Sequence, residues 1–302
     1  MTNLHLFTIP KAFDPRDDYG KHIDMIQRNA IENWIALNCE SKGIDITITI
    51  LGDDPGVRGV FYEYSKRDDI DVGHVLYVEY VDVVEPAGPS VRHVMEIADL
   101  FGDVDGLGPA SPDLVCYVNT DIMFCTDFLD TVAVLDRVYA GRQFLAVGQR
   151  HDVAMNQRWT WEIDPRGEAG EPRWEFRLKK YTGTFGRLHG IAGIDWFLHR
   201  PGLWGKQCSN IPDDLVLGRG YWDNFLVGDA VLSGHDVIDC TLTVTTVHQG
   251  HHVPWMAGNW DHPAILHNKR IVEAQNKVYY INRGNKRTIR IGNNIEVRDN
   301  DV

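Results

Sequence analysis

The sequence lacks the long apolar runs of a membrane protein and the basic surplus of a nucleic-acid-binding protein. Its longest apolar stretches, such as Ile46 to Leu51 and Val115 to Val118, fall far short of the roughly 20 residues that a membrane helix needs. Acidic residues outnumber basic ones by 43 to 30 among 302 residues, giving a formal net charge of −13. This excess repels the phosphate backbone that dominates nucleic-acid affinity. We therefore expect no membrane span and no broad nucleic-acid or anionic-membrane surface.

Cysteine pairs and a leader pattern are also missing. The odd number of cysteines and the absence of a C-x-x-C pair favour reduced, buried thiols over a disulfide framework or a zinc site. The five are Cys39, Cys116, Cys125, Cys208 and Cys240. No basic segment followed by an apolar one opens the sequence, so we expect no signal peptide and a cytoplasmic location.

Hydrophobic residues make up 43% of the chain, enough for a substantial core. Their periodicity in the first half predicts strands and helices in alternation, as in an α/β fold with a mixed, mostly parallel sheet flanked by helices. The expected strands are 4–9, 46–50, 74–80, 114–118 and 144–147, and the expected helices are 23–43 and, capped by Thr126, 126–141.

The second half has weaker periodicity. Residues 155–190 are rich in Trp, Arg, Gly and Glu, which predicts a functional excursion rather than a core element. Strands are expected at 191–198 and 237–247, followed by short strand-like pieces. Because there is no internal repeat or Pro/Ser-rich linker, we expect a single domain with a C-terminal extension.

A polar Asn-x-Asp follows the apolar run at 114–118. Ligands of open α/β sheets bind at the carboxyl ends of strands. There, the Asp121 carboxylate could bind Mg²⁺ or Mn²⁺, and Asn119 could hydrogen-bond a sugar hydroxyl. The alternative is an Asx turn that ends the strand.

Two further patterns could carry chemistry. Asp223 beside Trp222 could act as a general base on a sugar hydroxyl while the indole packs on its C–H groups, or the pair could be a structural Trp with a capping Asp. His248, His251 and His252 could supply a metal ligand or proton donors, or be structural; their spacing argues against a closed zinc site.

Other polar clusters close predicted strands and suggest one shared site. Arg150 could offset pyrophosphate charge. The tryptophans within residues 155–190 could form a platform that binds the acceptor. The alternative is that they are buried in the core. These clusters include Thr8 to Lys11, Asp53 and Asp54, Gln149 and Arg150, Asp195 and Trp196, and the tryptophans are Trp159, Trp161 and Trp174.

With these clusters in this order, the sequence resembles the nucleotide-diphospho-sugar transferases of the GT-A type, in particular glycosyltransferases of bacteria, plants and viruses. The resemblance covers most of residues 4–255. It rests on segments 7–11, 51–57, 117–122, 148–150, 193–197, 222–224 and 248–251. It implies a GT-A (Rossmann-like) domain over 1–255, with a nucleotide-sugar half at about 1–150 and an acceptor half at about 151–255. Residues 256–302 would be an extension packed on the same domain.

The resemblance also implies roles for individual residues. Asn119-Thr120-Asp121 stands at the Asp-x-Asp metal motif, with Asn in place of the first acid, so Asp121 would bind the ion and His248 would be a second ligand. The acceptor-side carboxylates would be Asp195 and Asp223, with Asp223 as the base. Nucleotide-sugar contacts would come from Thr8, Pro10, Lys11, Asp53, Asp54, Asn119, Thr120, Gln149 and Arg150, and acceptor contacts from Trp196, Arg219 and Trp222.

The expected activity is sugar transfer from a nucleotide-diphosphate sugar to a hydroxyl of a glycan or another acceptor, assisted by Mn²⁺ or Mg²⁺. A UDP-sugar is the expected donor. Two alternatives stay open. A metal-dependent phosphoryl or glycosyl hydrolase would consume the donor steadily without an acceptor. A non-catalytic carbohydrate-binding module would bind sugar regardless of nucleotide and metal.

Overall fold

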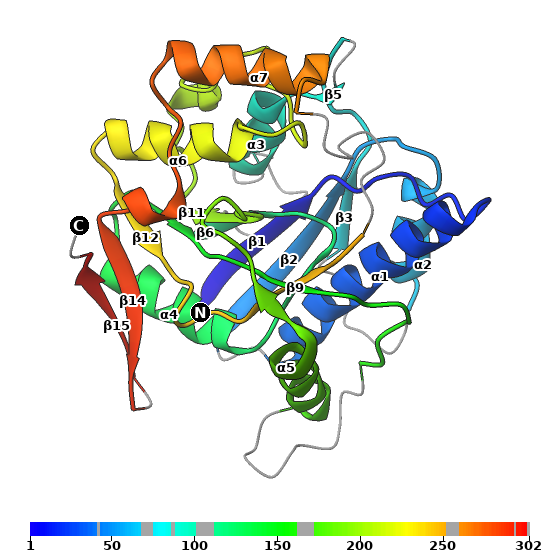
Figure 1. Ribbon diagram of the computed structural model, residues 1–302. Helices are drawn as coiled ribbons and strands as arrows, with labels where there is room; N and C mark the ends of the chain where they lie inside the picture. The colour runs from blue at the N-terminus through cyan, green and yellow to red at the C-terminus, as the bar shows by residue number, and fades with distance from the viewer. Residues whose placement is uncertain are drawn as a thin grey trace.

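A nine-stranded mixed sheet forms the centre of the computed structural model (Figure 1). The structure describes residues 1–40, 43–67, 75–85, 88–100, 112–161, 172–251, 260–292 and 294–300. The strands run in the order β15-β14-β12-β8-β11-β6-β1-β2-β3. Their bounds are β1 Thr2–Thr8, β2 Ile44–Leu51, β3 Val75–Val78, β6 Leu114–Val118, β8 Phe144–Val147, β11 Trp196–His199, β12 Asp236–Asp239, β14 Lys286–Ile291 and β15 Asn294–Asp299.

Most neighbours in this sheet are parallel. Strands β3, β2, β1 and β6 pair in parallel, and so do β8, β12 and β14. Strand β11 runs antiparallel between β6 and β8, and β15 forms an antiparallel hairpin with β14. All five residues of β6 are buried, as a strand covered on both faces requires. The expected mixed, mostly parallel α/β sheet is confirmed.

Helices cover both faces of the sheet. One face packs against α1, α2, α4 and α5, and the other against α3, α6 and α7, so each face has its own buried apolar cluster (Figure 1). Their bounds are α1 Asp18–Cys39, α2 Val57–Tyr64, α3 Val91–Leu100, α4 Asp127–Val138, α5 Arg173–Phe185, α6 Trp222–Leu232 and α7 Pro263–Ala274, with short 3₁₀ turns η2 Lys206–Cys208 and η3 Ile281–Arg283. Among the described residues, no helix is both long and apolar enough to cross a membrane.

A second, four-stranded sheet has the order β10-β9-β13-β7. Its strands come from distant parts of the chain and connect the end of β6 with the last third of the sequence. They are β7 Ile122–Phe124, β9 His151–Val153, β10 Arg187–Leu188 and β13 Thr246–Gln249, and a separate hairpin pairs β4 Val83–Val84 with β5 Gly88–Pro89.

The structure corrects several local predictions. The strand expected at 237–247 is two strands, β12 and β13, which belong to different sheets. The stretch 155–190 contains helix α5, whose Trp174 and Leu178 are buried, so part of it is core. The side chain of Thr126 makes no cap hydrogen bond to α4. Helix α7 replaces expected strand-like pieces because its apolar residues follow helical spacing.

Other expectations are met in part, and two of the residues concerned fall outside the described part of the chain. The strand expected at 191–198 begins only at Trp196. All five cysteines are free thiols; four are buried and Cys39 is exposed. Residue 74, at the start of a predicted strand, and residue 252, in the histidine cluster, lie outside the described part of the chain.

Candidate active site

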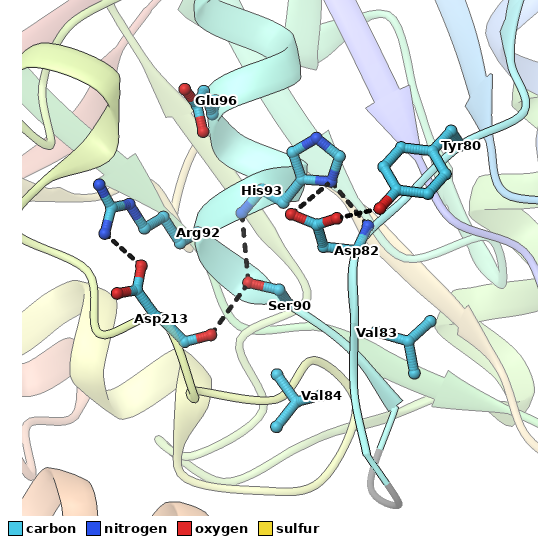
Figure 2. A pocket seen from close by; sticks show the side chains of 9 residues that line it. All are labelled: Tyr80, Asp82, Val83, Val84, Ser90, Arg92, His93, Glu96 and Asp213. Atoms are coloured by element: carbon cyan, nitrogen blue, oxygen red, sulfur yellow. Dashed lines mark hydrogen bonds and ion pairs between the residues drawn. The ribbon is translucent and has the colours of Figure 1, made fainter.

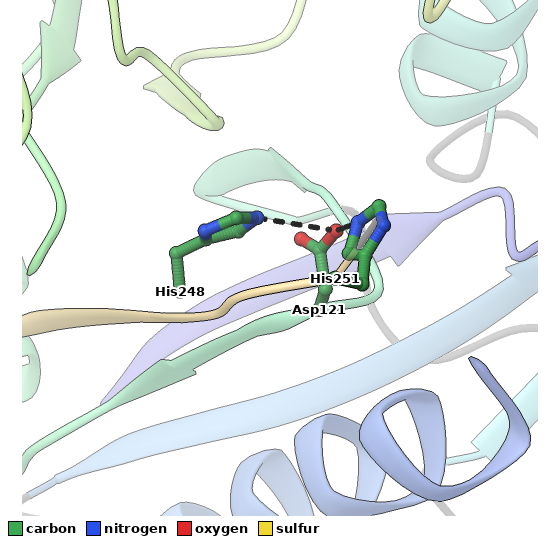
Figure 3. A group of neighbouring side chains, drawn as sticks. All are labelled: Asp121, His248 and His251. Carbon is green, nitrogen blue, oxygen red and sulfur yellow. Dashed lines mark hydrogen bonds and ion pairs between the residues drawn. The ribbon is translucent and has the colours of Figure 1, made fainter. Parts of the chain in front are cut away.

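Three side chains in or next to the neighbouring strands β7 and β13 of the small sheet converge on one point (Figure 3). Asp121 lies between β6 and β7, His248 lies in β13, and His251 follows β13. The Asp121 Oδ2 atom is 3.0 Å from His251 Nε2 and 3.7 Å from His248 Nε2. Possible ligand atoms of the three residues lie within 4.8 Å of one another. This arrangement can hold a metal ion.

The chemistry of these donors fits a divalent cation. The second oxygen of Asp121, Oδ1, is buried and has no hydrogen-bond partner among the described residues. A buried carboxylate oxygen without a partner is costly unless a ligand or ion satisfies it. One carboxylate with two imidazoles suits ions such as Mn²⁺, which accept both oxygen and nitrogen ligands. His251 is a third candidate ligand. The sequence offered it as a possible ligand within the histidine cluster, but only His248 was assigned to the metal site beside Asp121.

Charge coupling within this group is strong. Burial alone would raise the pKa of Asp121, but His248 and His251 together hold it well below its usual range. Burial would likewise lower the pKa of His248, yet the Asp121 charge and the hydrogen bond to Asp152 raise it to about 9. A cation that replaced the histidine protons would meet an ionised carboxylate.

A chain of polar contacts leads away from this group toward Asp195, by way of Asp152 and Arg150. Arg150 donates to Asp152 Oδ1 over 3.0 Å and to Asp195 Oδ2 over 2.5 Å. Asn119 donates its amide to Asp195 Oδ1 over 2.7 Å and accepts from the Tyr117 hydroxyl over 3.0 Å. Both oxygens of Asp195 are therefore occupied, and the Asn119 side chain orients Asp195.

Asp223 has a different environment in the first turn of α6. Burial and the charge of Asp195 raise its pKa to about 7, although backbone hydrogen bonds at the helix start and the Arg150 charge oppose the rise. The preceding residue but one, Tyr221, has φ 63°, and Gly218 and Gly220 on its N-terminal side also have positive φ. Left-handed backbone at a non-glycine residue is strained and often marks a functional turn. A carboxyl with a pKa near neutrality can act as a general base.

The residues at the carboxyl ends of strands β1 and β2 differ in how deeply they are buried. Thr8 and Thr120 are buried and share a hydrogen bond of 2.7 Å between their hydroxyls. The Lys11 ammonium is near enough to Asp121 and Arg219 to be attracted by the first and repelled by the second. Pro10 is buried, whereas Asp53 and Asp54 are exposed beyond the end of β2.

Some predicted contacts disagree with the structure. Trp196 is 0% exposed and packs edge-on against Phe124 and Phe128, so it has no face for an acceptor sugar. Trp222 is only 5% exposed, because its ring packs against Tyr117 and Phe197.

The remaining predicted residues have mixed surroundings. The Gln149 amide donates to the His189 carbonyl over 2.7 Å, so it ties two loops together. Arg219 is half-buried. Trp174 is buried, and Trp159 and Trp161 pack against the core rather than forming an open platform.

A separate polar hollow of about 660 Å³ lies between the β4–β5 hairpin and α3 (Figure 2). It contains none of the site residues predicted from the sequence. Inside it, the Tyr80 hydroxyl donates to Asp82 over 2.6 Å, and the Asp82 backbone N–H donates to His93 Nδ1 over 2.7 Å. Its lining is Tyr80, Asp82, Val83, Val84, Ser90, Arg92, His93, Glu96 and Asp213.

No family model and no curated protein sequence matches this chain. Among solved structures, it is similar to residues 1–349 of S. aureus TarS in complex with UDP-GlcNAc, with a TM-score of 0.53 and 10% identity over 91% of this chain and 66% of that one. The chain thus spans just under two thirds of that TarS structure. This likeness shows the fold, which is of the GT-A type found in nucleotide-sugar enzymes.

Two further solved structures are similar at lower TM-scores. GalNAc-T7 with UDP, GalNAc and Mn²⁺ has a TM-score of 0.46 and 14% identity over 90% of this chain and 48% of that one. HddC from Yersinia pseudotuberculosis has a TM-score of 0.44 and 8% identity over 82% of this chain and 93% of that one.

Proposed function

We propose that this protein is a metal-dependent glycosyltransferase that uses a nucleotide-diphosphate sugar, with a UDP-sugar as the expected donor. The observation that carries the proposal is the convergence of Asp121, His248 and His251 at the carboxyl end of β6, the edge where ligands of open α/β sheets bind. The GT-A fold and the UDP-GlcNAc bound to TarS support the choice of donor.

Asp121, His248 and His251 would hold Mn²⁺ or Mg²⁺, and the two imidazoles favour Mn²⁺. When bound, such an ion supplies positive charge that stabilises the departing diphosphate. Arg150 and Lys11 would add positive charge beside it. The remaining donor contacts would come from Thr8, Pro10, Asp53, Asp54, Asn119, Thr120 and Gln149.

Asp223 would accept the proton of the acceptor hydroxyl. Its raised pKa matches a base that works near neutral pH. Asp195 would act differently, because Arg150 and Asn119 already occupy both of its oxygens. It would hold Arg150 in place. Arg219 would contact the acceptor.

We also propose that residues 1–255 form the transferase domain and that 256–302 pack on it as an extension. The Lys277 ammonium lies 2.8 Å from Asp229 on α6. Strands β14 and β15 extend the central sheet beyond β12. These contacts support an extension that does not fold as a separate unit.

The test is calorimetric titration with UDP, GDP and other nucleoside diphosphates, each with and without Mn²⁺. The wild type is compared with Asp121→Ala and His251→Ala. The control is Asp236→Ala in strand β12, whose carboxylate accepts hydrogen bonds from Tyr139 and Asn285 and belongs to no part of the candidate site. We expect one nucleotide to bind with Mn²⁺ and both site variants to weaken that binding at least 10-fold. Binding of no nucleotide under any condition would refute the proposal. A second assay incubates the protein with the sugar donor and no acceptor, and steady hydrolysis of the donor there would favour the hydrolase.

A further inference from the structure

The carboxylate of Asp152 makes three hydrogen bonds beside the candidate metal site. Its Oδ1 is 2.9 Å from His248 Nδ1 and 3.0 Å from Arg150 Nε, and its Oδ2 is 2.6 Å from His189 Nδ1. A carboxylate can only accept hydrogen bonds, so each of these nitrogens donates a proton to it. One side chain thus contacts a candidate metal ligand and the guanidinium expected beside the donor.

The contact with His248 is built into the small sheet. Strands β9 and β13 pair in parallel, and their register sets Asp152 directly beside His248. Neighbouring residues in register point to the same face of a sheet. The hydrogen bond therefore depends on strand pairing and not on a flexible loop.

The direction of this hydrogen bond decides which nitrogen of His248 can bind a metal. With Nδ1 donating to Asp152, Nε2 is the nitrogen that faces Asp121, at 3.7 Å from its Oδ2. A ligating histidine is usually held in this way, with its other ring N–H donated to a carboxylate that fixes the tautomer and the ring orientation.

We propose that Asp152 is a positioning residue that presents Nε2 of His248 to the metal and holds Arg150 at the donor site. Asp152 itself is not in the group that could ligate the ion, since it lies on the Nδ1 side of the imidazole. The inference rests on the proposed function, because it requires that the group around Asp121 binds a metal.

The experiment measures Mn²⁺ affinity from the electron paramagnetic resonance signal of the free ion, without nucleotide or turnover. We expect Asp152→Ala to weaken Mn²⁺ binding about 10- to 100-fold. Asp152→Asn keeps one accepting oxygen and should recover part of that loss. The matched control is His189→Ala, which removes one partner of Asp152 but leaves its bonds to His248 and Arg150, and should stay within about 3-fold of wild type.

The outcomes separate this inference from the metal site itself. If Asp121→Ala loses Mn²⁺ but folded Asp152→Ala binds it as the wild type does, the role of Asp152 is refuted and the metal site stands. If the wild type does not bind Mn²⁺, both fail.

A second measurement needs no variant. Nitrogen NMR of the wild type with Cd²⁺, a diamagnetic substitute, should show the proton of His248 on Nδ1. A proton on Nε2 would overturn the inference even if the Asp152 variants did not fold.

Discussion

The half-buried carboxyl of Asp223 carries a cost that its replacement should remove. Burial, together with the nearby charge of Asp195, raises its pKa from 3.8 to about 7. The folded protein therefore holds a proton on Asp223 at pH values where the unfolded chain has lost it. Replacing Asp223 with Asn removes the titration and keeps an oxygen that can accept the backbone N–H of Asn224. We expect the variant to be more stable than the wild type at neutral and alkaline pH.

The size of the effect follows from the pKa difference. A rise of about 3 pKa units corresponds to about 4 kcal/mol at most, and structural relaxation would reduce this to about 2–4 kcal/mol. The sign follows from the protonation state of Asp223. Below pH 3.8 the carboxyl is protonated in both the folded and the unfolded wild type, so its burial costs no stability. Above pH 7 it is ionised in both states, and the full cost of burying the charge applies. The stability advantage of Asp223→Asn should grow by up to about 1.4 kcal/mol per pH unit between these values and then level off.

The assay is urea unfolding of both proteins at pH 5, 6, 7 and 8, with Asp214→Asn as control because that carboxylate is exposed. The control should change stability by less than about 0.5 kcal/mol at every pH. In parallel, Asp223→Asn should lower turnover about 10²- to 10⁴-fold and abolish the fall in kcat/KM below about pH 7. A pH-independent stability difference would refute the burial argument, and near-normal turnover would refute the role as base.

Two further predictions concern packing. Lys277→Met should cost about 3–5 kcal/mol in urea unfolding because it leaves the buried carboxylate of Asp229 unpaired, and the double variant with Asp229→Asn should recover part of the loss; a loss below about 1 kcal/mol would show that the pair is solvated. Trp196→Ala should cost about 3–5 kcal/mol, since its ring is fully buried against Phe124 and Phe128. A thermally stable Trp196→Ala protein with weakened acceptor binding would instead restore the predicted sugar contact.

The spacing of apolar residues in the sequence predicts many of the strands and helices. The continuous apolar run of β6 and the helical stripe of α4 identify their elements because burial on two faces or on one leaves a recognisable spacing. The order of the polar clusters at the ends of the predicted strands indicated the GT-A fold, and the likeness to TarS shows that fold. The position of Asp121 after a buried strand was enough to nominate it as a metal ligand.

Other features depend on contacts between residues far apart in the chain. Periodicity could not divide 237–247 between two sheets, since both pieces are apolar and only their partners differ. Nor could it separate Trp196, which is core, from an exposed tryptophan. The spacing of His248 and His251 after a strand was a usable signal for a pair of ligands, but only the first was assigned to the metal.

The sequence by itself determined the α/β class, the order of the strand-end motifs and the position of one acidic candidate ligand, because these follow from spacing along the chain. Only the tertiary structure decided that His251 joins Asp121 and that Asp152 lies beside His248. Those neighbours depend on the register of β7, β9 and β13, which pair across more than 90 residues. Strand register is fixed by the packing of the whole sheet, and no local pattern encodes it.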